Sequence, residues 1–167
     1  MKVLVPVEDD FVAKSQIEFL LSYKWPAKTE IRLVHVLHTL IVERSMVSSQ
    51  VYLDKLVKEA RKYAEDLMST IEKTLKKESP EIKVSREFVE GAPVEEIVNL
   101  AKKWESDMIV LCSHGREGLG QLILGSVSYN VLVHSPCKVI IVGLPHHERG
   151  QGDPSEWKDA RVQVTIT

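Results

Sequence analysis

The sequence has few cysteines, no long apolar run and no excess of charge of one sign. Two cysteines among 167 residues are too few for a disulfide framework. The formal net charge of −2 argues against a general surface for nucleic acid or anionic membranes, because such surfaces need clustered Lys and Arg. No apolar stretch approaches the ~20 residues that a membrane span requires. These absences leave an ordinary soluble chain of one-domain size.

The N-terminal segment and the small number of cysteines predict the cellular compartment. An apolar strand begins within two residues of Met1, which leaves no room for a charged region followed by an apolar signal segment. We therefore expect a cytoplasmic protein with reduced thiols. Cys112 and Cys137 are expected at opposite ends of neighbouring strands, too far apart to form a bridge. No dedicated metal site is predicted, because two histidine pairs lack cysteine or carboxylate partners at ligand spacing: His35 with His38, and His146 with His147.

Strands and helices are expected to alternate along the chain. Short apolar runs predict strands at residues 2–7, 30–37, 81–89, 107–111 and 138–142. Apolar residues at helical spacing predict helices from about residue 13 to 21, at 51–77, from 93 and at 126–134. Alternation of this kind implies an α/β fold, with a parallel sheet, right-handed crossovers and helices on both faces. The pattern does not fix the order of the strands.

The most informative stretch runs from Met108 to Gly115 and is followed, after nine intervening residues, by Gly125 and Ser126. An apolar run without alternation is typical of a strand buried on both faces. A glycine-containing turn directly after it lets main-chain N–H groups point outward together, as phosphate sites require. We expect Ser126 to cap the next helix, so that the helix N–H groups and positive dipole end converge on the same anion. The stretch predicts a nucleotide site.

This stretch resembles the phosphate-binding signature of the universal stress protein family, which reads Gly, two residues, Gly, nine residues, Gly, then Ser or Thr. Gly115, Gly125 and Ser126 match, His114 follows Ser113 in the two-residue gap, and Cys112 replaces the first Gly. Matches at residues 3–7, 33–36, 91–93 and 136–142 extend the resemblance over most of the chain. We therefore expect a nucleotide-binding domain at residues 1–144, followed by a linker and a short terminal strand at 145–167.

The resemblance implies an open, doubly wound, five-stranded sheet of order 3-2-1-4-5. That order creates a switch point between the first and fourth strands, where ligands bind at the carboxyl ends. The implied ligand is ATP or ADP, and Mg²⁺ can accompany the phosphates with few protein ligands of its own. The resemblance and the turn chemistry together assign nucleotide binding to Pro6, Val7, Glu8, Val36, Cys112, Ser113, His114, Gly115, Arg116, Gly125, Ser126, Val127 and Ser128.

Three of these residues have alternative interpretations. Glu8 stands where family members carry an Asp near the adenosine, but Glu8, Asp9 and Asp10 would also serve to cap the following helix. Cys112 adds a side chain where backbone and ligand approach, so we expect weakened binding rather than none. His114 beside a glycine turn is interpreted as a hydrogen-bonding spacer and not as a catalytic base.

The leading functional hypothesis is a homodimeric, nucleotide-binding regulator of the stress response. The resemblance implies that the fifth strand pairs with its equivalent across a two-fold axis through Val139, Ile140, Ile141 and Val142. Hydrolysis is expected to be slow or absent, because the sequence has no convincing base and no Lys in a Walker-type loop. The alternative is a dimeric interaction module that binds no nucleotide. In either case the alternation at residues 161–167 predicts a terminal strand at a sheet edge or dimer interface, with a disordered tail as the other interpretation.

Overall fold

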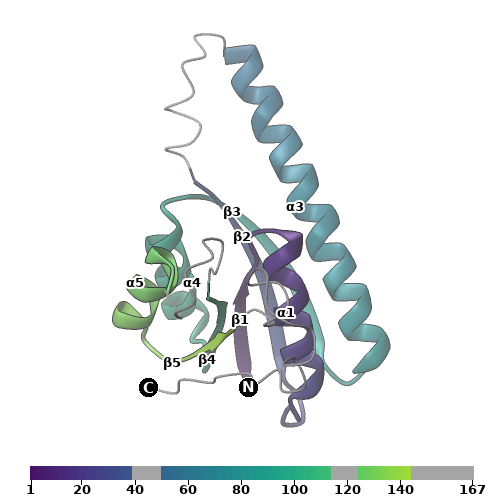
Figure 1. Cartoon of the computed structure of the whole chain (residues 1–167). Helices are drawn as coiled ribbons and strands as arrows, with labels where there is room; N and C mark the ends of the chain where they lie inside the picture. The colour runs from purple at the N-terminus through teal and green to yellow at the C-terminus, as the bar shows by residue number, and fades with distance from the viewer. Residues whose placement is uncertain (39–49, 114–123, 144–167) are drawn as a thin grey trace, which may run out of the picture.

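Five parallel strands form one sheet in the order β3-β2-β1-β4-β5 (Figure 1). The computed structural model describes residues 1–38, 50–113 and 124–143. The order that the family resemblance implies is therefore confirmed, and the switch point lies between β1 and β4. The strands are β1 (Lys2–Pro6), β2 (Glu30–His38), β3 (Lys83–Gly91), β4 (Met108–Cys112) and β5 (Lys138–Val142).

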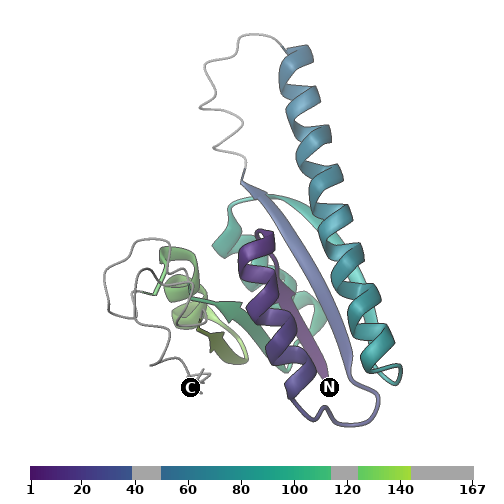
Figure 2. The same cartoon turned by 45° about the vertical axis from the view of Figure 1, so that its right-hand side comes forward.

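Helices cover both faces of the sheet. The helices are α1 (Asp10–Ser22), α3 (Gln50–Glu78), α4 (Pro93–Trp104) and α5 (Ser126–His134). Two views show α1 and α3 over one face and α4 and α5 over the other (Figures 1 and 2). Val5, Leu33 and Met68 belong to the core under α1 and α3, whereas Leu4 and Ile97 belong to the core under α4 and α5. None of the helices in these parts of the chain has both the length and the apolar character that a membrane span needs.

The strands next to the switch point are buried on both faces. All five residues of β4 are buried, as are Val3, Leu4 and Val5 of β1. Because helices cover both faces of a parallel sheet, its central strands gain stability from apolar residues at every position. This explains why residues 108–111 show no alternation in the sequence.

Several boundaries differ from the predicted ones by one or two residues. β3 begins at Lys83, although alternation in the sequence suggested residue 81. The Ile82 N–H donates to Ser79 O at 3.1 Å and closes a turn, and the Ile82 side chain is buried. In the sequence, the buried Ile82 of this turn therefore looked like the first inward-facing residue of the strand. The predicted terminal strand at residues 161–167 lies outside the described residues.

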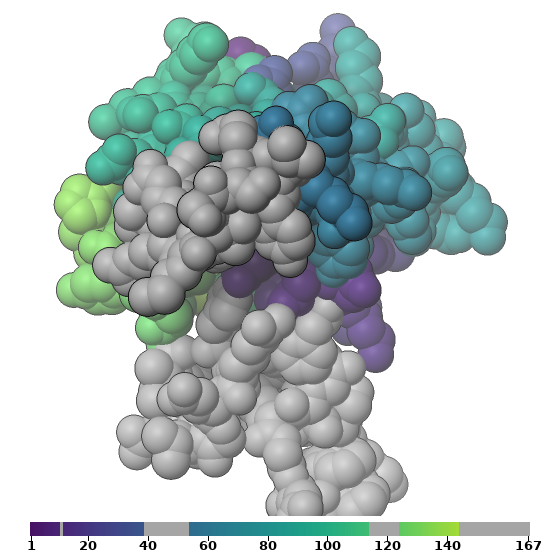
Figure 3. All heavy atoms as spheres, turned by 90° about the horizontal axis from the view of Figure 1, so that it is seen from above, coloured from purple at the N-terminus to yellow at the C-terminus, as the bar shows by residue number. Residues whose placement is uncertain are grey.

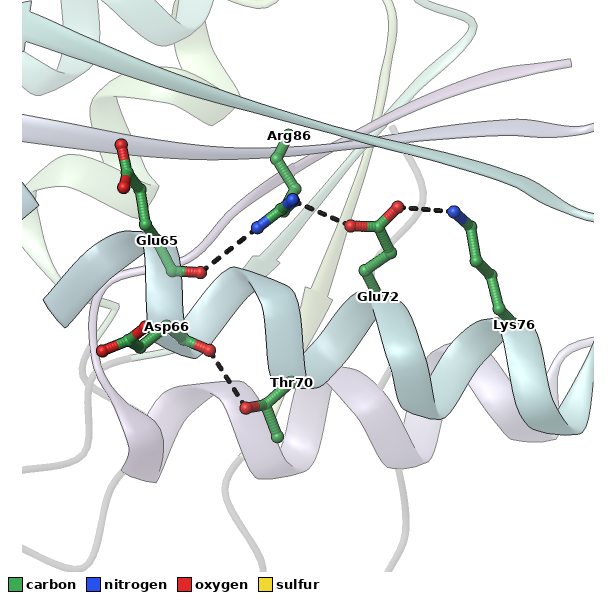
Figure 4. A network of polar contacts seen from close by, with 6 residues as sticks. All are labelled: Glu65, Asp66, Thr70, Glu72, Lys76 and Arg86. Carbon is green, nitrogen blue, oxygen red and sulfur yellow. Dashed lines mark hydrogen bonds and ion pairs between the residues drawn. The ribbon is translucent and has the colours of Figure 1, made fainter. Parts of the chain in front are cut away.

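Polar contacts attach the second half of α3 to the edge strand β3 (Figure 4). One Glu72 carboxylate oxygen lies 2.7 Å from Arg86 Nε, and the other lies 2.6 Å from Lys76 Nζ. A guanidinium nitrogen of Arg86 also donates to the main-chain carbonyl of Glu65 at 3.4 Å. The Glu72 side chain is only 15% exposed, so these ion pairs are screened less than surface pairs. Together, these contacts hold the second half of α3 against the edge of the sheet.

Candidate functional site

The candidate site lies where β1 and β4 separate. Pairing of β1 with β2 continues to Pro6, opposite Val34, whereas pairing of β1 with β4 ends at Leu4, opposite Ile109. The β4 strand itself continues to Cys112 beside β5. The two central strands therefore part toward their carboxyl ends, which is where ligands bind in open α/β sheets. Seen from above, this end of the molecule shows atoms of α3 and α1 on one side and of α5 on the other (Figure 3).

Hydrogen bonds fix the backbone at the end of β1. The Val7 N–H donates to Val34 O at 2.8 Å, and Val7 O lies 2.9 Å from His35 Nδ1. After Glu8, the Asp9 carboxylate accepts from the Val12 N–H at 2.9 Å and caps α1. The capping role therefore belongs to Asp9. Glu8 is exposed between two anchored residues, so the backbone that carries its carboxylate has a defined direction.

His35 holds this backbone as a neutral ring. A carbonyl oxygen only accepts, so Nδ1 carries the hydrogen in its bond to Val7 O. The ring stacks on Phe88 with centroids 5.8 Å apart and planes 15° apart. Burial lowers the pKa of His35 below its ordinary value of 6.5, although the bond to Val7 and the charge of Glu8 oppose the shift. The imidazole is therefore neutral at physiological pH.

The lowered pKa predicts that His35 makes stability depend on pH. Below pH 6.5 the unfolded chain binds a proton that the folded chain binds less readily, so the free energy of unfolding should fall as the pH decreases. The His35→Asn variant keeps a donor near Val7 O and should lose this part of the slope. Urea denaturation at several pH values between 5 and 8 measures it. Identical pH profiles for the two proteins would contradict the prediction.

Val36 presents its main chain to the crevice. The register of β2 with β1 and the Val7 to Val34 bond show that even-numbered residues of β2 direct their polar groups toward β1. Because β1 ends at Pro6, the N–H and C=O of Val36 point past the last paired residue of that strand. The Val36 side chain packs instead against the core under α4 and α5. This is the arrangement that main-chain recognition of a base requires.

The start of α5 is fastened to the end of β4. The Ser128 hydroxyl, which is buried, donates to Cys112 O at 3.0 Å. The Ser113 N–H donates to Val142 O at 2.9 Å and continues the pairing of β4 with β5. These bonds place the first turn of α5 beside the carboxyl end of β4. The Ser128 side chain thus has a tethering role, which leaves its main-chain N–H as the group available for ligand contact.

The cap of α5 differs from the prediction. Ser126 was expected to be the N-cap, but it is the first helical residue, and the N-cap is Gly125. Gly ranks with the acceptable N-cap residues, and Gly125 has no side chain with which to cap the helix. The first main-chain bond of the helix runs from the Tyr129 N–H to Gly125 O at 2.9 Å. The N–H groups of residues 126–128 therefore have no intrahelical acceptor, and no acidic residue stands in the first turn to neutralise the dipole.

The Cys112 side chain packs against α1. It is 4% exposed and forms a small apolar cluster with Val12. The alternation along β4 puts Cys112 on the same face as Val110, which belongs to the core under α1 and α3. This position favours a packing role for the thiol over an obstruction of the ligand crevice. Cys112 and Cys137 are separate free thiols, as expected.

The Cys112→Gly variant distinguishes packing from obstruction. We expect a loss of about 1–2 kcal/mol in the free energy of unfolding, because the variant removes a buried side chain and adds backbone freedom in a strand. Nucleotide affinity should change by less than about threefold, because the thiol packs against α1 and not against the ligand. Chemical denaturation and calorimetric titration measure the two quantities. Much tighter nucleotide binding by the variant would show that the thiol obstructs the crevice.

The structure brings together most of the predicted site residues. Pro6 ends β1 and is followed by Val7 and Glu8, and Cys112 ends β4 and is followed by Ser113. Gly125 caps α5, whose first residues are Ser126, Val127 and Ser128, whereas Val36 lies one strand away on β2. His114, Gly115 and Arg116 lie outside the described residues. Sequence reasoning did not assign to His35 its role in holding the backbone at Val7. In the described residues, no group of three or more His, Cys, Asp or Glu could hold a metal ion.

The chain is similar in sequence and in structure to proteins of one family. The model of the universal stress protein family matches residues 1–143. Universal stress protein MJ0577 of Methanocaldococcus jannaschii is 30% identical over 152 residues, which cover 84% of this chain and 93% of that protein. The solved structure of MJ0577 gives a TM-score of 0.72 at 29% identity and covers 85% of this chain and 94% of that chain.

Two structures that share the fold were solved with adenine nucleotides. A universal stress protein family protein from Arabidopsis thaliana with AMP bound has a TM-score of 0.65 at 19% identity, and covers 93% of this chain and 98% of that chain. The universal stress protein from Archaeoglobus fulgidus in complex with dAMP has a TM-score of 0.56 at 17% identity, and covers 84% of this chain and 96% of that chain.

Proposed function

We propose that this chain, which belongs to the universal stress protein family, binds ATP or ADP in the crevice between β1 and β4. The observation that carries the proposal is the separation of these strands after Leu4 and Ile109, beside the uncapped first turn of α5. An anionic group in this crevice would meet main-chain N–H groups and the positive end of a helix dipole. The AMP and dAMP complexes of proteins with the same fold support an adenine nucleotide as the ligand.

The predicted residues have different roles in this proposal, and Gly125 leaves room for the phosphate at the start of α5. The main chain of Val36 contacts adenine, and the carboxylate of Glu8 accepts from the ribose hydroxyls. The N–H groups of Ser126, Val127 and Ser128 bind phosphate, together with His114, Gly115 and Arg116. Pro6, Val7, Ser113 and the main chain of Cys112 form the walls of the crevice. Mg²⁺ would accompany the phosphates and keep most of its waters.

We further propose that the nucleotide acts as a regulatory ligand in a cytoplasmic homodimer that takes part in the stress response. The N–H and C=O groups of β5 that do not pair with β4 support a dimer formed through that edge. Slow or absent hydrolysis follows from the sequence, which offers no Lys in a Walker-type loop. Bound ATP or ADP would then set the conformation or the partners of the dimer rather than be consumed.

The first experiment identifies the ligand directly. The purified protein is denatured, and the released small molecules are analysed by mass spectrometry. The emptied protein is then titrated with ATP, ADP and GTP, with and without Mg²⁺. Recovery of ATP or ADP, or saturable binding that favours adenine over guanine, would support the proposal. A protein that carries no nucleotide and ignores millimolar ATP would instead favour the dimeric interaction module.

A further inference from the structure

A proline interrupts the pairing of β1 with β4. The register of Leu4 with Ile109 means that the next N–H of β1 directed toward β4 belongs to residue 6, and its acceptor would be Val110 O. Residue 6 is proline, which has no N–H to donate. Val110 O is also buried among apolar residues, so leaving this carbonyl without a donor would be costly. The fold therefore needs a donor at this position from outside the sheet.

Gln16 of α1 supplies that donor. Its side-chain Nε2 lies 2.8 Å from Pro6 O and 3.2 Å from Val110 O. An amide nitrogen carries two hydrogens, so Gln16 can bond both carbonyls at once. The side chain is 2% exposed, between Ala13 and Leu20 on the buried face of α1. Gln16 thus bridges β1 and β4 where the direct ladder stops.

The bridge also sets the distance between the two strands. A direct ladder brings neighbouring strands to about 4.8 Å, whereas a side-chain amide inserted between two carbonyls keeps them further apart. Pro6 O belongs to the same peptide group as the Val7 N–H, which donates to Val34 O, and the following carbonyl, Val7 O, is bound to His35. Gln16 therefore acts on the backbone that leads directly into Glu8.

We propose that Gln16 is a positioning residue of the nucleotide site, which holds the ends of β1 and β4 at the separation that the ligand needs. The inference rests on the proposed function, because it names the residue that shapes the same crevice. Gln16 touches no ligand in this proposal. It acts through Pro6 and Val110, so its loss should change the width of the crevice and the direction of Glu8 together.

The Gln16→Leu variant tests the proposal in the full-length protein. Leu has a similar volume but no donor, so we expect ATP affinity to fall by about tenfold or more, with a lower melting temperature. Ser15→Ala is the matched control, because Ser15 is a neighbouring buried residue of α1 whose hydroxyl has no partner among the described residues. The control should keep both the affinity and the melting temperature. An unchanged affinity in Gln16→Leu would overturn the proposal.

A second pair of variants separates positioning from simple stabilisation. Pro6→Ala restores an N–H at residue 6, so the Pro6→Ala, Gln16→Leu double variant can form the missing bond to Val110 O directly. We expect it to recover most of the melting temperature lost in Gln16→Leu but not the ATP affinity, because the direct ladder closes the crevice. Recovery of both properties together would show that Gln16 only stabilises the fold.

A readout without ligand keeps the test independent of nucleotide binding. In Pro6→Ala with Gln16 present, Gln16 still occupies Val110 O, so the amide hydrogen of Ala at position 6 should exchange quickly with solvent. In the double variant that amide should be protected. Equal protection in both would overturn the proposal. If the wild-type protein binds no nucleotide, the proposed function fails, and this comparison alone decides whether Gln16 spaces the strands.

Discussion

The Gly125→Val variant is expected to lose nucleotide affinity by about 100-fold or more while it stays folded. Gly125 adopts φ −58° and ψ 152°, which any L-residue can adopt, so the backbone does not require glycine. Replacing glycine at an N-cap costs the helix about 1 kcal/mol. The added side chain would instead stand beside the N–H groups of residues 126–128, where the phosphate must approach. Under the proposed function, the glycine is needed for the ligand and not for the fold.

Calorimetric titration with ATP and thermal unfolding of the same samples measure the two effects. Tyr129→Ala is the matched control, because Tyr129 is 56% exposed in the next turn of α5 and has no role in the proposed site. It should bind ATP as the wild type does. The melting temperature of Gly125→Val should fall by only a few degrees, about 2–4 °C for each kcal/mol in a chain of this size. Wild-type affinity in Gly125→Val would contradict the phosphate site.

The Ile141→Pro variant is expected to convert the proposed dimer into a monomer. The Ser113 to Val142 bond and the register of β4 with β5 direct the polar groups of residues 138, 140 and 142 toward β4. The N–H groups of Val139 and Ile141 therefore point to the outer side of β5, beyond which no further strand lies in the described residues. Proline at 141 removes one outward donor without breaking a bond to β4, as edge strands tolerate. Strand pairing across a two-fold axis would lose its central bonds.

Sedimentation equilibrium of the wild type and the variant tests this prediction. Ile141→Ala is the matched control, since it also loses the buried side chain but keeps the main-chain N–H. We expect the control to remain dimeric and the dissociation constant of Ile141→Pro to rise by about 100-fold or more. A wild-type monomer, or a proline variant that dimerises normally, would rule out pairing through β5.

The central part of the fold could be predicted from the sequence because burial on both faces leaves a clear pattern. Unbroken apolar runs identified β4 and β5 closely, and the helical spacing gave α5 its observed bounds. The strand order needed the family resemblance, because periodicity describes each strand and not its neighbours. The start of β3 was wrong because the buried Ile82 belongs to a turn, and alternation alone cannot tell the two apart.

The site was predictable where it depends on local sequence and not where it depends on distant contacts. Glycine followed by serine predicted the start of α5. Because Ser is usually preferred at the N-cap, the cap was assigned to Ser126 instead of Gly125. Gln16 could not be identified, because one of its two acceptors lies 94 residues away at Val110. A polar residue on an apolar helix face and a proline inside a strand were both visible. Only the structure shows that they compensate each other.

The length of α3 divides this helix into two parts that differ in local stability. A helix of 29 residues is about 43 Å long, whereas the nine residues of β3 span about 30 Å, so the first turns of α3 extend beyond the sheet (Figure 1). From residue 54 to the end of α3, the buried side chains all lie between Ala64 and Leu75. This is the part of the helix that Glu72 attaches to β3. Opening the earlier turns exposes Leu56 and Val57, which are only half-buried, and leaves the core intact. Amide exchange in those turns should therefore report a smaller free energy than global unfolding, and a partner that contacts them would change the length of ordered helix without moving the sheet.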